Sequence, residues 1–176
     1  MKRLTVLAVL AVLCMSSLSY AQFASTGTTT LSVTVGTEAS IHIDTGSTTL
    51  ATSGGNFGNP YTGTTNFTYK VRTMQTGGHG SITLRVSTDF GTGGPSVGNP
   101  VNGDLLTYTC TNSGVGTACP SAVTALTTDT NVVSFGTDAK SKIAGDTGQV
   151  IWSLTNDPAY ATGTYTATVT FTVSAA

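Results

Sequence analysis

GTYTATVTFTVSA, residues 163–175, is the stretch that decides the fold of this 176-residue chain. Every second residue from Tyr165 to Val173 is apolar, and every residue between them is threonine. Because successive side chains of a β-strand point to opposite faces, this order gives one apolar face and one face covered with hydroxyl groups. A helix would scatter the same apolar residues around its circumference. We therefore expect Gly163–Ala175 to form a strand whose apolar face is covered by other strands.

The same alternation recurs along the chain, and no window beyond residue 21 has a helical period. Residues 65–74 and 81–86 are interpreted as a hairpin across a glycine-rich turn. Trp152 alternates with apolar neighbours and is expected in the core. Residues 28–44 are expected to form one long bent strand or two short ones, and further strands are expected at 105–110, 122–126, 131–135 and 149–154. The pattern predicts an all-β, immunoglobulin-like antiparallel β-sandwich of about seven to nine strands, which strand exchange could complete; a small barrel is the alternative.

Residues 1–21 have the features of a signal peptide. Lys2 and Arg3 precede an apolar run, and Ser19-Tyr20-Ala21 is a small-x-small cleavage site. The run is too short to span a bilayer, so no membrane anchor is expected. These features predict a secreted protein that passes through the periplasm to the cell surface or the extracellular space. The mature chain would comprise an N-terminal strand at 22–36 and a sandwich domain at 37–176.

Charge is sparse in the predicted mature chain. Removal of residues 1–21 leaves five Lys and Arg residues against eight Asp and Glu residues, a net charge of −3. Charged residues make up 9% of the whole sequence, against about 25% in ordinary globular proteins. A surface with so little charge does little to repel copies of itself, which permits self-association. The sequence has no run of basic residues, so nucleic acid is not an expected partner.

Two cysteines remain after residue 21, Cys110 and Cys119. An even pair in a secreted chain predicts a disulfide. Closing a loop of this length would stabilise the fold by roughly 2.5–3 kcal/mol on the chain-entropy estimate. The alternative, a redox or metal-binding pair, would need a tighter spacing or further ligands.

No pattern in the sequence predicts a catalytic, cofactor or metal site. Residues 94–98 read G-P-S-V-G and match the G-x-S-x-G motif of hydrolases, but that motif needs a strand before it, a helix after it and a later histidine. Both histidines, His42 and His79, precede Ser96. The acidic residues are dispersed and form no calcium-loop motif. Four tyrosines could stack on sugars or pack in the core and turns: Tyr61, Tyr108, Tyr160 and Tyr165.

The closing residues 163–173, G-T-Y-T-A-T-V-T-F-T-V, also carry a family resemblance. They follow a signal peptide, an alternating first strand and a middle region with two cysteines. This layout resembles the secreted β-sandwich subunits of bacterial surface fibres, the spore-coat-U-like and archaic chaperone–usher pilins, which commonly end in G-x-Y-x-x-T-V-T-V-T-V. Seven residues match this pattern, namely Gly163, Tyr165, Thr168, Val169, Thr170, Thr172 and Val173.

The resemblance implies a subunit that polymerises by strand donation, in which an N-terminal segment of one copy supplies an edge strand missing from the next. The candidate donor is Thr28–Val35, with Leu31, Val33 and Val35 as the inserted side chains and Gly36 as a hinge. The alternative is that these residues form the first strand of their own domain. Implied partners are copies of the chain or related fibre subunits, a periplasmic chaperone and an outer-membrane usher.

Three functions follow from these features. The first is a non-catalytic structural subunit of a surface fibre, pilus or extracellular matrix that self-assembles by β-strand addition. The second is an adhesin-like module that binds carbohydrates or surface glycans through loops at one end of the sandwich. The third, a secreted hydrolase, would require converging Ser, His and Asp residues or paired carboxylates.

Overall fold

The computed structural model describes residues 26–97 and 105–176. The chain divides into two units, residues 1–34 and 35–176. The predicted signal peptide at residues 1–21 lies outside the described residues. Within the described ranges, the structure contains no helix with the length and apolar character needed to cross a membrane.

Residues 35–176 form two antiparallel sheets, and no helix occurs in the part of this unit that the structure describes. The six-stranded sheet has the order β1-β3-β9-β5-β7, and β2 pairs with β3 beside this path. Its strands are β1 (Glu38–Ile43), β2 (Ala51–Thr52), β3 (Tyr61–Arg72), β5 (Leu106–Asn112), β7 (Val123–Thr124) and β9 (Asp146–Leu154). The four-stranded sheet has the order β10-β4-β8-β6. Its strands are β4 (Gly80–Thr88), β6 (Thr117–Ala118), β8 (Thr130–Phe135) and β10 (Thr168–Ala175).

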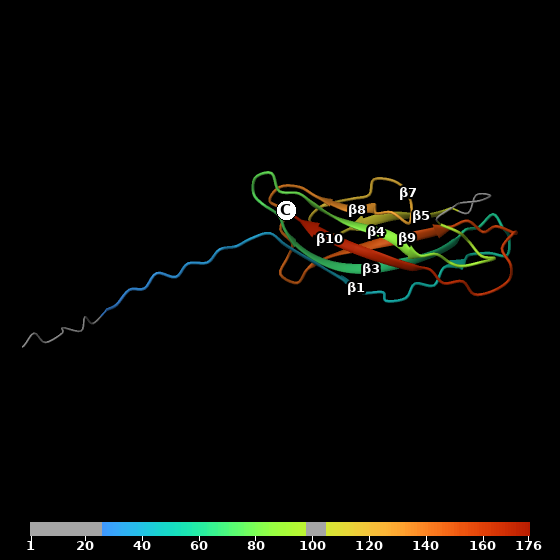
Figure 1. The fold of residues 1–176 in the computed structure, drawn as a ribbon, viewed down its shortest axis with the longest axis horizontal. Coiled ribbons are helices and arrows are strands. Elements are labelled where there is room, and N and C mark those ends of the chain that lie inside the picture. Colours follow the sequence, from blue (N-terminus) through green and yellow to red (C-terminus); the bar gives the residue numbers. More distant parts are fainter. Residues whose placement is uncertain (1–25, 98–104) are drawn as a thin grey trace, which may run out of the picture. The chain divides into compact units, whose positions relative to one another are not determined.

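The two sheets pack face to face, and Figure 1 shows β10 and β4 overlying β3 and β9. The ring centroids of Phe67 on β3 and Phe171 on β10 lie 6.0 Å apart across this interface. The core residues come from alternate positions of the central strands, including Phe67, Tyr69, Ile82, Leu84, Val150 and Trp152, all at most 4% exposed. The prediction of an all-β fold is confirmed. The strands form two separate sheets and not a closed barrel.

Trp152 lies in the core, as its alternation predicts. Its indole Nε1 donates a hydrogen bond of 2.8 Å to Oγ1 of Thr65, which is itself buried. The simple alternation fails on β8, where Val132 and Val133 are adjacent and both fully buried. The register between β4 and β8 shifts beside them, and such a bulge turns two successive side chains toward the same face.

The predicted hairpin between residues 65–74 and 81–86 is wrong. Both segments are strands, but β3 belongs to the six-stranded sheet and β4 to the four-stranded sheet. The chain crosses from one sheet to the other through residues 73–79, where Thr73 and His79 are held by backbone bonds to Ala139 and Ala176. β3 and β4 are adjacent in sequence but therefore lie in different sheets and do not pair.

The final strand is shorter than predicted, because it begins at Thr168 and not at Gly163. Thr168 pairs with Thr88, the last residue of β4, so earlier residues have no β4 partner. Tyr165 packs instead against Gly94, where a Cβ atom would collide with its ring, and its hydroxyl donates to the carbonyl of Gly93 at 3.0 Å. Residues 45–63 are rich in Thr, Ser, Gly and Asn, a composition that predicts a loop, but they contain β2 and the first residues of β3.

Candidate functional site

Both sheets end at each border of the sandwich, with β7 and β6 at one border and β1 and β10 at the other. β1 is the last strand of the six-stranded sheet on this side, and β10 is the last strand of the four-stranded sheet. Some Cα atoms of the two strands lie within 8 Å of one another, so the two edges run side by side. We call this pair of edges the open border. Each of its strands pairs on one side only, β1 with β3 and β10 with β4.

The apolar side chains at the open border are only half-buried. They pack against the core, and they comprise Ala39, Ile41 and Ile43 on β1 and Val169, Phe171 and Val173 on β10. One strand further in, Phe67 on β3 and Leu84 on β4 have no exposed surface. The alternation of apolar and polar residues therefore continues into β1 and β10. Full burial of the apolar side chains, however, ends at the neighbouring strands, β3 and β4.

β10 lacks most of the features that protect edge strands from pairing. Its residues Thr168–Ala175 include no charged residue and no proline, and its only irregularity lies at its start, between Thr168 and Val169. Natural edge strands commonly carry lysine, proline or a mid-strand bulge that disfavours another strand. Along seven of its residues, β10 therefore has no feature that disfavours a further strand.

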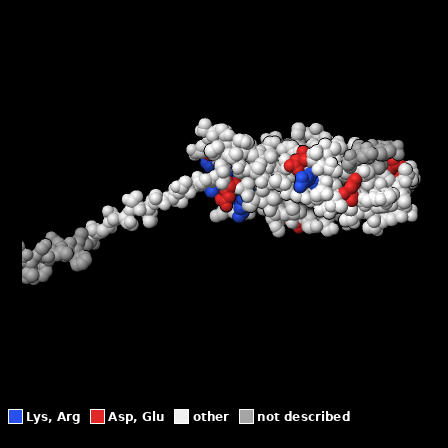
Figure 2. All heavy atoms as spheres, in the orientation of Figure 1, with Lys and Arg blue, Asp and Glu red and all other residues white. Residues whose placement is uncertain are grey.

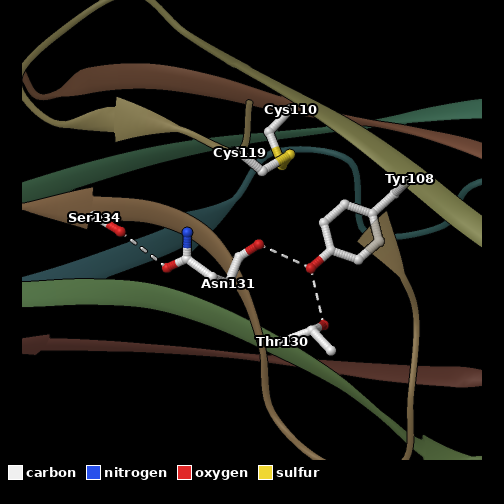
Figure 3. The surroundings of a disulfide bond; sticks show 6 residues. All are labelled: Tyr108, Cys110, Cys119, Thr130, Asn131 and Ser134. Atoms are coloured by element: carbon white, nitrogen blue, oxygen red, sulfur yellow. Dashed lines mark hydrogen bonds between the residues drawn. A yellow bond between two sulfur atoms is a disulfide. The ribbon is translucent and has the colours of Figure 1, made fainter. Parts of the chain in front are cut away.

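The opposite border, which we call the closed border, is held together by covalent and polar links between the sheets. Cys110 on β5 and Cys119, which follows β6, form a disulfide with an S–S distance of 2.04 Å (Figure 3). Both cysteines are at most 9% exposed. The predicted disulfide is thus confirmed, and it joins the six-stranded sheet to the four-stranded sheet.

Tyr108 adds a second link at the closed border. Figure 3 shows its hydroxyl between the Thr130 hydroxyl, at 2.8 Å, and the Asn131 carbonyl, at 2.9 Å, both on β8 of the other sheet. Burial raises the pKa of the Tyr108 phenol above its ordinary value of 10.0, and the hydrogen bond with Thr130 partly opposes that rise. The folded state therefore favours the neutral form of the Tyr108 phenol.

The predicted donor residues are exposed. Residues 26–37 carry no regular secondary structure. The side chains of Leu31, Val33 and Val35 are 91%, 84% and 61% exposed. The strand that the alternation predicts over 28–44 is therefore formed only by Glu38–Ile43. Three apolar side chains with strand spacing remain in solvent, which is unusual for a segment that belongs to a finished fold.

Arg72 fixes the point where the chain enters β1. Its Nε donates a hydrogen bond of 2.6 Å to the Gly36 carbonyl, and its Nη2 lies 3.0 Å from the Glu38 carboxylate. This hydrogen bond holds the carbonyl group of Gly36, the predicted hinge, beside the Arg72 guanidinium. No signal in the sequence paired Arg72 with Gly36, because the contact depends on the register between β1 and β3.

The remaining sequence candidates form no chemical site among the described residues. The Ser96 hydroxyl donates to Asp89 at 3.0 Å, and the same carboxylate accepts from the Val97 amide, so this loop is arranged around a carboxylate and not a histidine. His42 is exposed on β1, with its Nε2 3.8 Å from Asp44. No group of three His, Cys, Asp or Glu residues within 26–97 and 105–176 could hold a metal ion.

Comparisons with protein-family models, with curated proteins and with solved structures each found no match. The features that bear on function are therefore the open border and the exposed residues Thr28–Val35.

Proposed function

We propose that this protein is a non-catalytic, exported structural subunit that assembles by β-strand addition. Residues Thr28–Val35 of one copy add to the open border of the next, and copies joined in this way form a surface fibre, pilus or extracellular matrix. A periplasmic chaperone and an outer-membrane usher are partners in this proposal, by the resemblance to archaic pilins. In this reading the immunoglobulin-like sandwich lacks one edge strand in each isolated copy.

The observation that carries the proposal is the match between two unsatisfied surfaces of one chain. The open border offers half-buried apolar side chains and an unpaired strand edge of Thr168–Ala175. Thr28–Val35 offers the same length of chain, with apolar side chains at alternate positions and hydroxyl groups between them. An added strand satisfies backbone groups by pairing and places alternate side chains on the apolar face.

The energetic contribution of the three apolar residues is large enough to decide assembly. Full burial of a Leu or Val side chain contributes about 1.5–3 kcal/mol. Leu31 and Val33 are almost fully exposed, so nearly all of this contribution is still to be gained. Replacement by aspartate removes it and adds the cost of burying a charge without a partner.

The test compares the mature wild-type protein with the variant Leu31→Asp/Val33→Asp/Val35→Asp, by light scattering and negative-stain microscopy. The wild type should form filaments, and the variant should remain a folded monomer. The matched control is Thr30→Asp/Ser32→Asp/Thr34→Asp, which places the same number of charges on the other face of the same segment and should still assemble. A monomeric wild type, or a control that fails to assemble in the same way, would refute strand addition.

A further inference from the structure

Most of the positive charge in the sandwich lies around one hollow. Of the five Lys and Arg residues after residue 21, four line a hollow of about 390 Å³ at the end of β3: Lys70, Arg72, Lys140 and Lys142. The fifth, Arg85, is exposed on β4 in the other sheet. Figure 2 shows blue side chains gathered close to red ones at this part of the surface. The sequence disperses these four cations over more than 70 positions, so no basic run announces them.

The hollow is built by backbone pairing between two distant segments. The Ser141 amide donates to the Val71 carbonyl at 3.0 Å, and the Ser141 hydroxyl accepts from the Val71 amide at 2.6 Å. An antiparallel bridge joins Arg72 to Lys140. These contacts fix the backbones that carry the cations, so the spacing of the positive groups is part of the fold.

Carboxylates hold three of the four cations in place without burying them. The ion pairs are Arg72 with Glu38 at 3.0 Å, Lys140 with Asp138 at 2.6 Å and Lys142 with Asp146 at 3.8 Å. Lys70 forms no ion pair within 4 Å among the described residues. The side chains of the Arg72–Glu38 and Lys140–Asp138 pairs are 41–77% exposed, and pairs in such surroundings contribute only about 0–1 kcal/mol. The Asp146 side chain is only 2% exposed, so Lys142 pairs with a buried carboxylate. An incoming anion can therefore pair with Lys70 and exchange with the carboxylates of Glu38 and Asp138 at small cost.

We propose that this hollow binds the carboxylate-bearing sugar units of an acidic polysaccharide. The four cations, with Lys70 free to pair, suit a carboxylate. The exposed Ile143 side chain, at 95% exposure, offers an apolar contact to a sugar ring, and Ser40 adds a hydroxyl group to the lining. With Glu38, Asp138 and Asp146 beside them, the four cations leave a net charge of only +1 (four positive, three negative), which suits one sugar carboxylate at a time better than a densely charged phosphate polymer. A single exposed isoleucine is a small anchor for a membrane.

Assembly would multiply this weak site. A fibre built by strand addition repeats the hollow once per subunit, so a long polysaccharide can engage several sites at once and the overall affinity rises steeply. This part of the inference rests on the proposed function. Binding by one hollow does not, because all of its residues belong to residues 38–143 of a single copy.

The test measures binding to immobilised polygalacturonate, with neutral dextran as the reference surface. The monomeric variant Leu31→Asp/Val33→Asp/Val35→Asp measures one hollow, and assembled wild type measures the array. In the monomer background, Lys70→Gln should weaken binding by roughly tenfold. Arg85→Gln is the matched control, since it removes one exposed charge from the outer face of a strand elsewhere, and it should leave binding unchanged.

Equal losses from Lys70→Gln and Arg85→Gln would overturn the proposal, because they would show attraction to net charge and not to the hollow. Absence of binding by the folded monomer would also overturn it, while filament formation by the wild type would still support strand addition. Stronger binding to heparin or to vesicles containing anionic lipid than to polygalacturonate would replace the carboxylated sugar with another class of partner. If the wild type forms no fibres but the monomer binds, the proposed function fails and the hollow remains a glycan site.

Discussion

The two borders of the sandwich are both made of β-strands, but they differ in the links that join the two sheets. At the closed border, the consecutive strands β5, β6, β7 and β8 alternate between the two sheets, and the Cys110–Cys119 disulfide ties the sheets together. At the open border, β1 and β10 come from opposite ends of the domain, and no disulfide joins them. The two borders therefore differ in whether a disulfide links the two sheets.

The contrast also suggests why the open border does not collapse. The closed border is stabilised within one copy, so it can hold the two sheets together whether or not a further strand covers the open border. The half-buried state of Ile41 and Phe171 is then a cost that the closed border offsets. The following predictions test this division of roles, from the largest expected effect to the smallest.

The largest effect is expected from a matched pair of isoleucines, one interior and one at the open border. Ile82→Ala removes a side chain with no exposed surface and should lower the free energy of unfolding by about 2–5 kcal/mol. Ile41→Ala removes a half-buried side chain and should cost about half as much in the monomer, because less area leaves contact. Urea unfolding of both variants in the assembly-deficient background measures the difference. Equal costs would mean that the open border is already covered.

Removal of the disulfide tests the closed border. Cys110→Ala/Cys119→Ala should lower the free energy of unfolding by roughly 2.5–3 kcal/mol, since the unfolded chain gains freedom. Reduction of the wild type with dithiothreitol should have a similar effect. Both changes are followed by urea unfolding. Filaments should still form at low temperature, because the disulfide lies at the border that does not take part in assembly; loss of assembly by a folded, reduced protein would contradict the assigned roles.

Alkaline pH should weaken the folded domain through its buried tyrosines. Burial raises the pKa values of Tyr69 and Tyr108 above 10.0; Asn112 opposes the rise at Tyr69, and Asp146 adds to it. Their contribution is complete below the pKa of the unfolded chain and is lost as pH rises through 10 toward the folded values, because the unfolded chain then ionises first. Unfolding free energies between pH 8 and 11 should fall less steeply in Tyr69→Phe/Tyr108→Phe. An unchanged slope would contradict this cause.

The smallest effect is expected from the anchor at the start of β1. Arg72→Ala removes the contacts to Gly36 and Glu38, and because the side chain is 41% exposed it should cost less than about 1 kcal/mol of stability. Filament growth followed by light scattering should nevertheless slow, since the segment then leaves the domain in a less defined direction. Arg85→Ala is the control. A growth rate equal to that of the control would remove Arg72 from the assembly mechanism.

The faces of individual strands were readable from the sequence, but their partners were not. Alternation correctly assigned Trp152 to the core, because it reports which face of one strand is apolar. It could not tell that β3 and β4 lie in different sheets, since pairing depends on contacts between distant residues. The double burial of Val132 and Val133 was hidden for a related reason, as a bulge arises between two strands and not within one.

The candidate site shows the same limit more sharply. Leu31, Val33 and Val35 follow the same odd-position pattern as Ala39 and Ile41, yet the first set is exposed and the second packs on the core. The alternation indicates that one face of a segment is apolar, but it does not indicate which other residues will pack against that face. The open border can be identified only from the strand order. The basic hollow depends on the backbone bridge that brings Arg72 and Lys140 together from distant segments.

The central claim is that Thr28–Val35 adds to the edge of β10, and hydrogen–deuterium exchange tests it most directly. The measurement adds a peptide of residues 28–35 to the full-length assembly-deficient variant and follows the amides of Thr168–Ala175. We expect these amides to exchange more slowly with the peptide, while residues 117–124 at the closed border stay unchanged. A peptide with aspartate at positions 31, 33 and 35 should have no effect. Unaltered exchange at 168–175, or equal protection by both peptides, would contradict the claim.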